Sequence, residues 1–191
     1  MPIEMILPKN HEEKELFYLL GIAISAWSEV EFSLFVLLDR CLMSDRFLSY
    51  HVFWASRSYD VQFKMVSACV EEKVESTEGR EEWKKVQKEF RSQRENRNSI
   101  AHSKIMTIEF ARDGEINRTT FLAPGGTKWM TGFGAEDNQL VADEAGNLIP
   151  APANRMFQND LLEVIRSFVS LSDQITDFFT KWVDTQKKAR A

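Results

Sequence analysis

Apolar residues recur at spacings of three and four over long stretches of this chain, at residues 11–43, 45–74 and 154–185. A similar but more charged pattern runs from about residue 80 to residue 102. This period is typical of amphipathic α-helices. A helix of 30 residues is about 45 Å long, which suits an antiparallel bundle. The sequence therefore predicts a mainly α protein, an antiparallel four-helix-type bundle.

Each predicted helix has a stripe of side chains that we expect to face the core. The second stripe belongs to a single helix expected at about residues 45–74. The stripes are Leu16, Leu20, Ala23, Ile24, Trp27, Leu34, Leu38 and Leu42; Leu48, Val52, Ala55, Tyr59, Phe63, Val66, Cys69 and Val70; Trp83, Val86, Phe90, Arg94, Arg97 and Ala101; and Leu162, Ile165, Phe168, Val169, Ser172, Ile175, Phe179 and Trp182.

The pattern changes between the third and the last predicted helix. The runs KIMTIEFA and EINRTTFLA favour β-structure and flank Asp113-Gly114, a pair typical of tight hairpin turns. A second short hairpin is expected around residues 144–147. We therefore interpret residues 1–191 as one helical domain that contains a β-hairpin-rich insertion at residues 103–153.

Charge is unevenly distributed along the chain. The net charge of −5 argues against a generally basic surface for nucleic acids. Residues 80–104, however, contain eight Lys or Arg and four Glu, a local charge of +4 that leaves −9 for the rest. This segment fits either a focused anion site or a solvated helix face.

The sequence also suggests a compartment and several absences. Cys41 and Cys69 lie in apolar helical stretches, where we expect core packing and no disulfide. The N-terminus lacks the pattern of a signal peptide, and no run approaches the roughly 20 apolar residues of a membrane span. The sequence predicts a cytoplasmic protein with no membrane contact, and no metal or other cofactor is expected.

The string RNSIAH, residues 97–102, is the best candidate for chemistry. Arg97 has the planar donor fork that binds phosphate, and His102 is one of only three histidines, the side chain that exchanges protons near neutral pH. On a helix, Asn98 and His102 lie one turn apart, whereas Arg97 lies about 140° around the axis from His102. One helix supplies one histidine, and cleavage of RNA through the 2′-hydroxyl needs a base and an acid.

A homodimer resolves this shortage. A two-fold interface places the same patch of both subunits together, so it would bring two copies of the string into one composite site. We therefore expect a homodimer with RNA as its substrate.

The RNSIAH string resembles the R-polar-x3-5-H motif of HEPN-domain proteins, which are helical bundles and often metal-independent endoribonucleases in defence, toxin–antitoxin and RNA-processing systems. Its place late in the third helix also resembles that family, and so does Glu31, which interrupts an inward-facing stripe on the first helix. The likeness covers about 140 residues in architecture and omits the insertion.

The resemblance implies roles for five residues. His102 would be the general base or acid, Arg97 would bind the scissile phosphate, and Asn98 would position the phosphate or orient His102. Glu31 would orient Arg97 or Arg94 through an ion pair. The product would be a 2′,3′-cyclic phosphate, and an antitoxin or other partner protein is expected in such systems.

Alternatives remain open at this point. His102 suits the C-terminal end of a helix, where a cation interacts favourably with the dipole. Arg94 and Arg97 suit a structural tie to Glu31. The whole chain suits a catalytically inactive HEPN-like module for dimerisation, ligand sensing or protein interaction, a reading that the acidic net charge favours.

Overall fold

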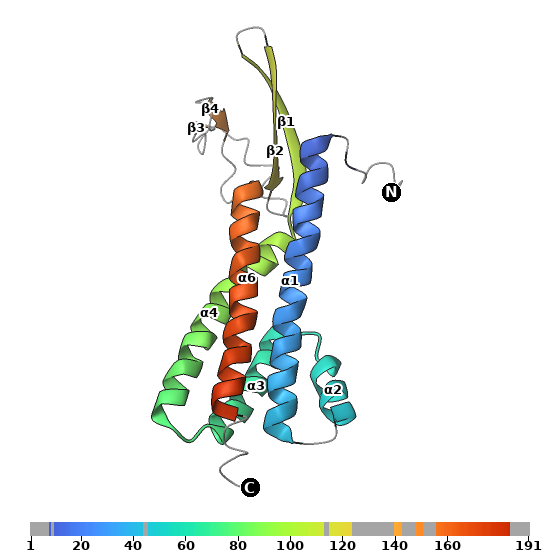
Figure 1. The fold of residues 1–191 in the computed structure, drawn as a ribbon. Helices are drawn as coiled ribbons and strands as arrows, with labels where there is room; N and C mark the ends of the chain where they lie inside the picture. The colour runs from blue at the N-terminus through green and yellow to red at the C-terminus, as the bar shows by residue number, and fades with distance from the viewer. Residues whose placement is uncertain are drawn as a thin grey trace. The chain divides into compact units, whose positions relative to one another are not determined.

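The computed structural model describes residues 8, 10–43, 46–112, 115–123, 140–142, 148–150 and 156–183. The protein is mainly helical (Figure 1). In chain order its elements are α1 (His11–Leu42), α2 (Arg46–Ala55), α3 (Tyr59–Lys73), α4 (Thr77–Ala101), β1 (Lys104–Arg112), β2 (Glu115–Ala123), β3 (Leu140–Ala142), β4 (Leu148–Pro150), α6 (Gln158–Phe178) and the π-helix η2 (Phe179–Val183).

The chain divides into two compact units. The first contains Met1–Ile24 and Glu95–Val164, and the second contains Ser25–Arg94 and Ile165–Ala191. Helices α1, α4 and α6 each contribute residues to both units. We call them the strand unit and the helical unit and describe each by itself.

Aromatic rings fill the centre of the helical unit. Trp27 of α1 is 3% exposed, and its ring lies 5.9 Å from Tyr59, 5.6 Å from Phe90 and 5.1 Å from Phe168. These partners belong to α3, α4 and α6, so one side chain contacts three other helices. Such ring pairs add about 0.5–1.5 kcal/mol each beyond the burial of their area.

The same core continues towards the start of α4. Phe63 stacks on Phe90 with ring centroids 4.0 Å apart and on Trp83 at 5.8 Å, and Trp83 lies 5.0 Å from Phe178. The predicted core positions Trp83, Val86 and Phe90 of α4 are buried as expected.

The second predicted helix is two helices, and the expectation of one continuous helix is wrong. The break falls at residues 56–58, where the Ser56 hydroxyl accepts a hydrogen bond from the Ser58 amide (3.2 Å) and Ser58 is extended, with φ −106° and ψ 117°. Gln62 donates from Nε2 to the carbonyls of Phe53 (3.2 Å) and Ser56 (3.0 Å). Serine side chains bond to nearby backbone readily and so compete with helix continuation.

This break changes which side of α2 is buried. Leu48 and Val52, placed in the core by an unbroken stripe, are 58% and 42% exposed, and Ala55 is exposed too. The residues of α2 that are buried are Ser49 and Phe53. In α3 the stripe holds, because Phe63, Val66 and Val70 are buried.

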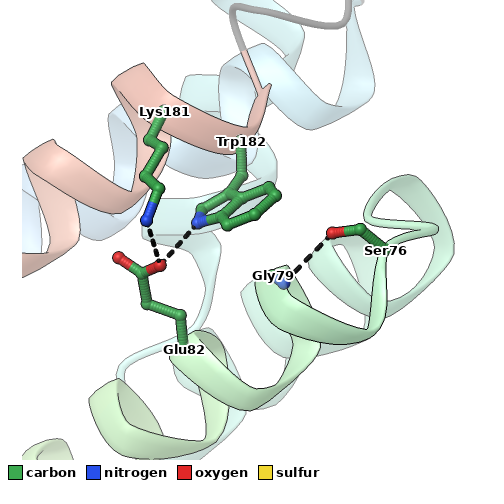
Figure 2. A network of polar contacts seen from close by, with 5 residues as sticks. All are labelled: Ser76, Gly79, Glu82, Lys181 and Trp182. Carbon is green, nitrogen blue, oxygen red and sulfur yellow. Dashed lines mark hydrogen bonds and ion pairs between the residues drawn. The ribbon is translucent and has the colours of Figure 1, made fainter.

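Helix α6 also differs from its predicted register. Val169 is 48% exposed; the predicted Phe168 and Ile175 are buried, and the other buried residues of α6 are Leu161, Val164, Leu171 and Phe178. The helix then widens into η2, where a polar network holds its end to α4 (Figure 2). Lys181 Nζ and Trp182 Nε1 both donate to Glu82 Oε2, at 2.8 Å each.

Gly79 permits a close approach beside this network. A Cβ atom at Gly79 would lie 2.5 Å from Val74 Cγ1, 2.9 Å from Ser76 Oγ and 3.1 Å from Trp182 Cδ2. The Ser76 hydroxyl accepts a hydrogen bond from the Gly79 amide (3.1 Å, Figure 2). A side chain has no room here.

In the strand unit, β1 and β2 pair antiparallel from Lys104↔Ala123 to Arg112↔Glu115. A bridge joins Leu122 to Met156 by two backbone hydrogen bonds of 2.9 and 3.0 Å. β3 and β4 form a separate short antiparallel pair.

Two carboxylates of α1 bind the strands of this unit. The Thr107 hydroxyl donates to Glu13 (2.9 Å) and the Thr120 hydroxyl donates to Glu12 (2.9 Å), while the two hydroxyls lie 3.1 Å apart. These bonds attach the β1–β2 pair to the first turn of α1.

Two sequence expectations lie outside the described residues. They are the turns at residues 113–114 and 144–147. Among the described residues, α1 is long and apolar enough, by length and composition alone, to cross a membrane. This is weak evidence, because 44% of its most apolar window is buried, and both the core helix of a soluble protein and a signal sequence near the N-terminus pass the same test.

Candidate functional site

The RNSIAH string forms the last turn of α4. The helix ends at Ala101, and the His102 amide still donates to the Asn98 carbonyl at 3.2 Å. The Ser103 amide then donates to the Ile100 carbonyl (3.2 Å), and the Ser103 hydroxyl donates to the Ser99 carbonyl (2.6 Å). These tight bonds satisfy carbonyls that a helix end leaves without amide partners, so they fix the place where the helix stops.

The string places its polar residues on different sides of the helix. Asn98 and His102 are exposed, Arg97 is half-buried, and Ile100 is 3% exposed. The backbone bond between His102 and Asn98 keeps these two residues one helical turn apart. Arg97 and His102, five residues apart, diverge by about 140° around the axis.

Within one chain, Arg97 and Asn98 are in contact. Arg97 Nη1 donates to Asn98 Oδ1 at 3.3 Å. A guanidinium is a planar fork of donors, the shape that suits a phosphate. One copy of the chain therefore brings together an arginine and an amide, with one exposed histidine a turn further along.

The two supporting residues lie in the helical unit. Arg94 is bound by Asp60 of α3, whose Oδ1 accepts a short hydrogen bond from Arg94 Nη1. Arg94 Nε is buried and has no hydrogen-bond partner among the described residues. Glu31 is half-buried on α1, and its expected ion pair with Arg97 or Arg94 stays a prediction.

Sequence reasoning missed Asp60 for an identifiable reason. The pattern placed Asp60 in the middle of one long helix, whereas it is the second residue of α3, which begins at Tyr59 after the extended Ser58. The Ser56-Arg57-Ser58 run was the available signal, because serines favour turns and helix N-caps.

The other two histidines lie elsewhere and are both exposed. His11 begins α1 and His51 lies on α2. The structure places no group of three or more His, Cys, Asp or Glu side chains suited to hold a metal among the residues it describes.

Elsewhere on α4, in the helical unit, four cations form a row. Arg80, Lys84, Lys88 and Arg91 are all exposed and follow one another at spacings of four, four and three, so they share one side of the helix. Lys84 also pairs with Glu81 at 2.6 Å, and Arg80 Nε donates to the Val74 carbonyl at 2.9 Å.

Comparisons of this chain with protein-family models, with curated proteins and with solved structures find no match.

Proposed function

We propose that this chain is a metal-independent endoribonuclease of the HEPN type that acts as a homodimer in a defence or toxin–antitoxin setting. The observation that supports this proposal is the exposure of Asn98 and His102 one turn apart at the end of α4, beside the Arg97 side chain that contacts Asn98. In this proposal the chain is cytoplasmic, and residues 103–153 are an insertion into the four-helix-type bundle.

The chemistry needs two histidines in one site. The base removes the proton from the ribose 2′-hydroxyl, and the 2′-oxygen forms a bond to phosphorus. The bond from phosphorus to the 5′-oxygen then breaks, and the acid gives that oxygen a proton. His102 of each copy takes one of these roles, and the product is a 2′,3′-cyclic phosphate with a free 5′-hydroxyl.

Arg97 and Asn98 act on the phosphate. The guanidinium stabilises the negative charge that builds on the non-bridging oxygens during attack. Asn98, held by Arg97, positions the phosphate or orients His102. The row of exposed cations on α4 favours a polyanionic ligand, because each contact to a phosphate releases a counterion.

The test is RNA cleavage in the presence of EDTA by the wild type and by His102→Ala and Arg97→Ala. Loss of the acid and base is expected to lower the rate by about 10²–10⁴-fold, and loss of the arginine by about 10²–10³-fold. His11→Ala is the matched control, because this histidine is also exposed and begins another helix, α1. Equal cleavage by all variants would remove the assignment.

A second candidate is a non-enzymatic module of the same fold that dimerises, senses a ligand or binds an antitoxin or other partner. The half-buried position of Arg97 and the net charge of −5 favour it. Undetectable RNA cleavage at micromolar protein, together with co-purification of a co-encoded partner, would support this candidate over the nuclease.

A further inference from the structure

Helix α2 presents its apolar side chains outward. It has ten residues, of which Ser49 and Phe53 are buried. The exposed fractions of its large apolar residues are 77% for Phe47, 58% for Leu48, 50% for Tyr50, 42% for Val52 and 38% for Trp54. We call these five residues, with the exposed His51 among them, the α2 face.

This face continues onto α1 within the helical unit. Phe32 is 49% exposed, and its ring lies 6.1 Å from that of the buried Phe35. Phe35 in turn lies 5.8 Å from Tyr50, and Tyr50 lies 6.2 Å from Trp54. The aromatic rings therefore form a chain of neighbours from Phe32, through the buried Phe35, to Tyr50 and Trp54. We treat Phe32 and the α2 face together as one patch.

The patch is large enough to be an interface. Phe32, Phe47, Tyr50 and Trp54 together expose the equivalent of about two whole aromatic side chains, roughly 400 Å². The largest apolar patch on a typical monomer is about 300–600 Å², and a standard interface buries about 800 Å² on each partner. Four side chains thus supply about half of one partner's share, before Leu48 and Val52 are counted.

The patch also lacks charge in a chain that is rich in it. Charged residues make up 28% of the sequence and its net charge is −5, yet the run from Phe47 to Ala55 contains no Asp, Glu, Lys or Arg. Two copies of an acidic protein repel each other over most of their surfaces, and an uncharged apolar face removes that repulsion locally. A two-fold interface requires this kind of self-complementarity.

We propose that the α2 face binds the α2 face of a second copy of this chain. A lipid surface fits less well, because helices that lie on membranes have a polar side rich in Lys and Arg, whereas the opposite side of α2 is packed into the protein through Ser49 and Phe53. The proposal goes beyond RNA cleavage, because it names the surface through which the two copies of the homodimer bind, and that surface lies in the helical unit.

The experiment measures molar mass by sedimentation velocity across a range of micromolar concentrations. We expect the wild type to be a dimer, and Phe47→Glu/Leu48→Glu to raise the dissociation constant at least about a hundredfold, because buried apolar anchors dominate interfaces. Val169→Glu is the matched control, since it adds the same charge at an apolar position of α6 with 48% exposure. Leu48→Glu alone serves as the second variant if the double variant loses its helical circular dichroism.

Three results would overturn the proposal. One is a wild type that is monomeric in sedimentation velocity. This result would count against the proposal even if the monomer bound neutral lipid vesicles in a flotation assay. Another is a folded double variant that remains as dimeric as Val169→Glu. The third is a dimer that dissociates in an Ala101→Arg variant but not in the α2 variants. Because Ala101 lies beside His102, that result would place the interface at the end of α4. His102→Ala separates the two proposals, because it removes cleavage and is expected to leave the dimer intact.

Discussion

Arg94 of α4 and Asp60 of α3 form a hydrogen-bonded ion pair. The pair joins α3 to α4 through two residues that are 34 positions apart along the chain, and it satisfies one donor of a guanidinium whose Nε is buried. The arginine that the sequence assigned to a supporting role thus binds a carboxylate of α3.

We expect this pair to contribute little to stability. The side chains are 31% and 54% exposed, and ion pairs in such surroundings contribute about 0–1 kcal/mol. Urea unfolding of Asp60→Asn, Arg94→Gln and the double variant forms a mutant cycle, in which we expect a coupling of about 0.5 kcal/mol. A coupling above about 2 kcal/mol would mean that the pair is screened from solvent.

Gly79→Ala is expected to destabilise the protein by about 1–3 kcal/mol, although alanine is the better helix former. The new methyl group would lie 2.5 Å from Val74 Cγ1 and 3.1 Å from Trp182, and overpacking of this kind is costly. Gly21→Ala is the control, because nothing lies within 4 Å of its added Cβ. Thermal unfolding should show Gly21→Ala stabilised by up to about 1 kcal/mol. A stabilised Gly79→Ala would contradict the close approach.

The Glu82 network predicts a dependence of stability on pH. The hydrogen bond from Lys181, then that from Trp182, lowers the pKa of the Glu82 carboxyl below its ordinary value of 4.5. A lowered pKa adds stability that is present above the unfolded pKa and lost as the pH falls through the folded pKa. Glu82→Gln should therefore lower the melting temperature at neutral pH, and its difference from the wild type should narrow in acid.

The control for this prediction is Glu29→Gln, which neutralises an exposed carboxyl on α1. Its difference from the wild type should not follow the same acid profile. A Glu82→Gln difference that stays constant from neutral pH into acid would show that the network does not depend on the ionised carboxylate.

Thiol reactivity should differ between the two free cysteines. Burial, and then the neighbouring Cys69, raises the pKa of Cys41 to about 12, while burial also raises the pKa of Cys69. The thiolate is the reactive form, so both residues should be alkylated slowly in the native protein, and the fully buried Cys41 more slowly than the half-buried Cys69. Mass spectrometry after timed iodoacetamide treatment measures both rates, and faster labelling of Cys41 would contradict this order.

Helix content was predictable from sequence because the period of apolar residues is a local property. The buried positions Leu16, Trp27, Phe90 and Phe168 follow from it directly. The break at Ser56 and the outward side of α2 were not predictable in this way. Leu48 and Val52 keep the spacing of three and four between apolar residues whether or not the helix is interrupted.

The candidate site was predictable only in part. The helical spacing of Asn98 and His102 is local, and the helix does extend to that point. The pair between Arg94 and Asp60 is not local, because it depends on how α3 and α4 pack. Periodicity contains no information on such packing.

The arrangement around Glu82 makes the two contacts of η2 with α4 depend on one atom. Lys181 Nζ and Trp182 Nε1, on consecutive residues, both donate to Glu82 Oε2 at 2.8 Å. Loss of that carboxylate would therefore remove both hydrogen bonds at once, whereas loss of either donor would leave the other bond in place.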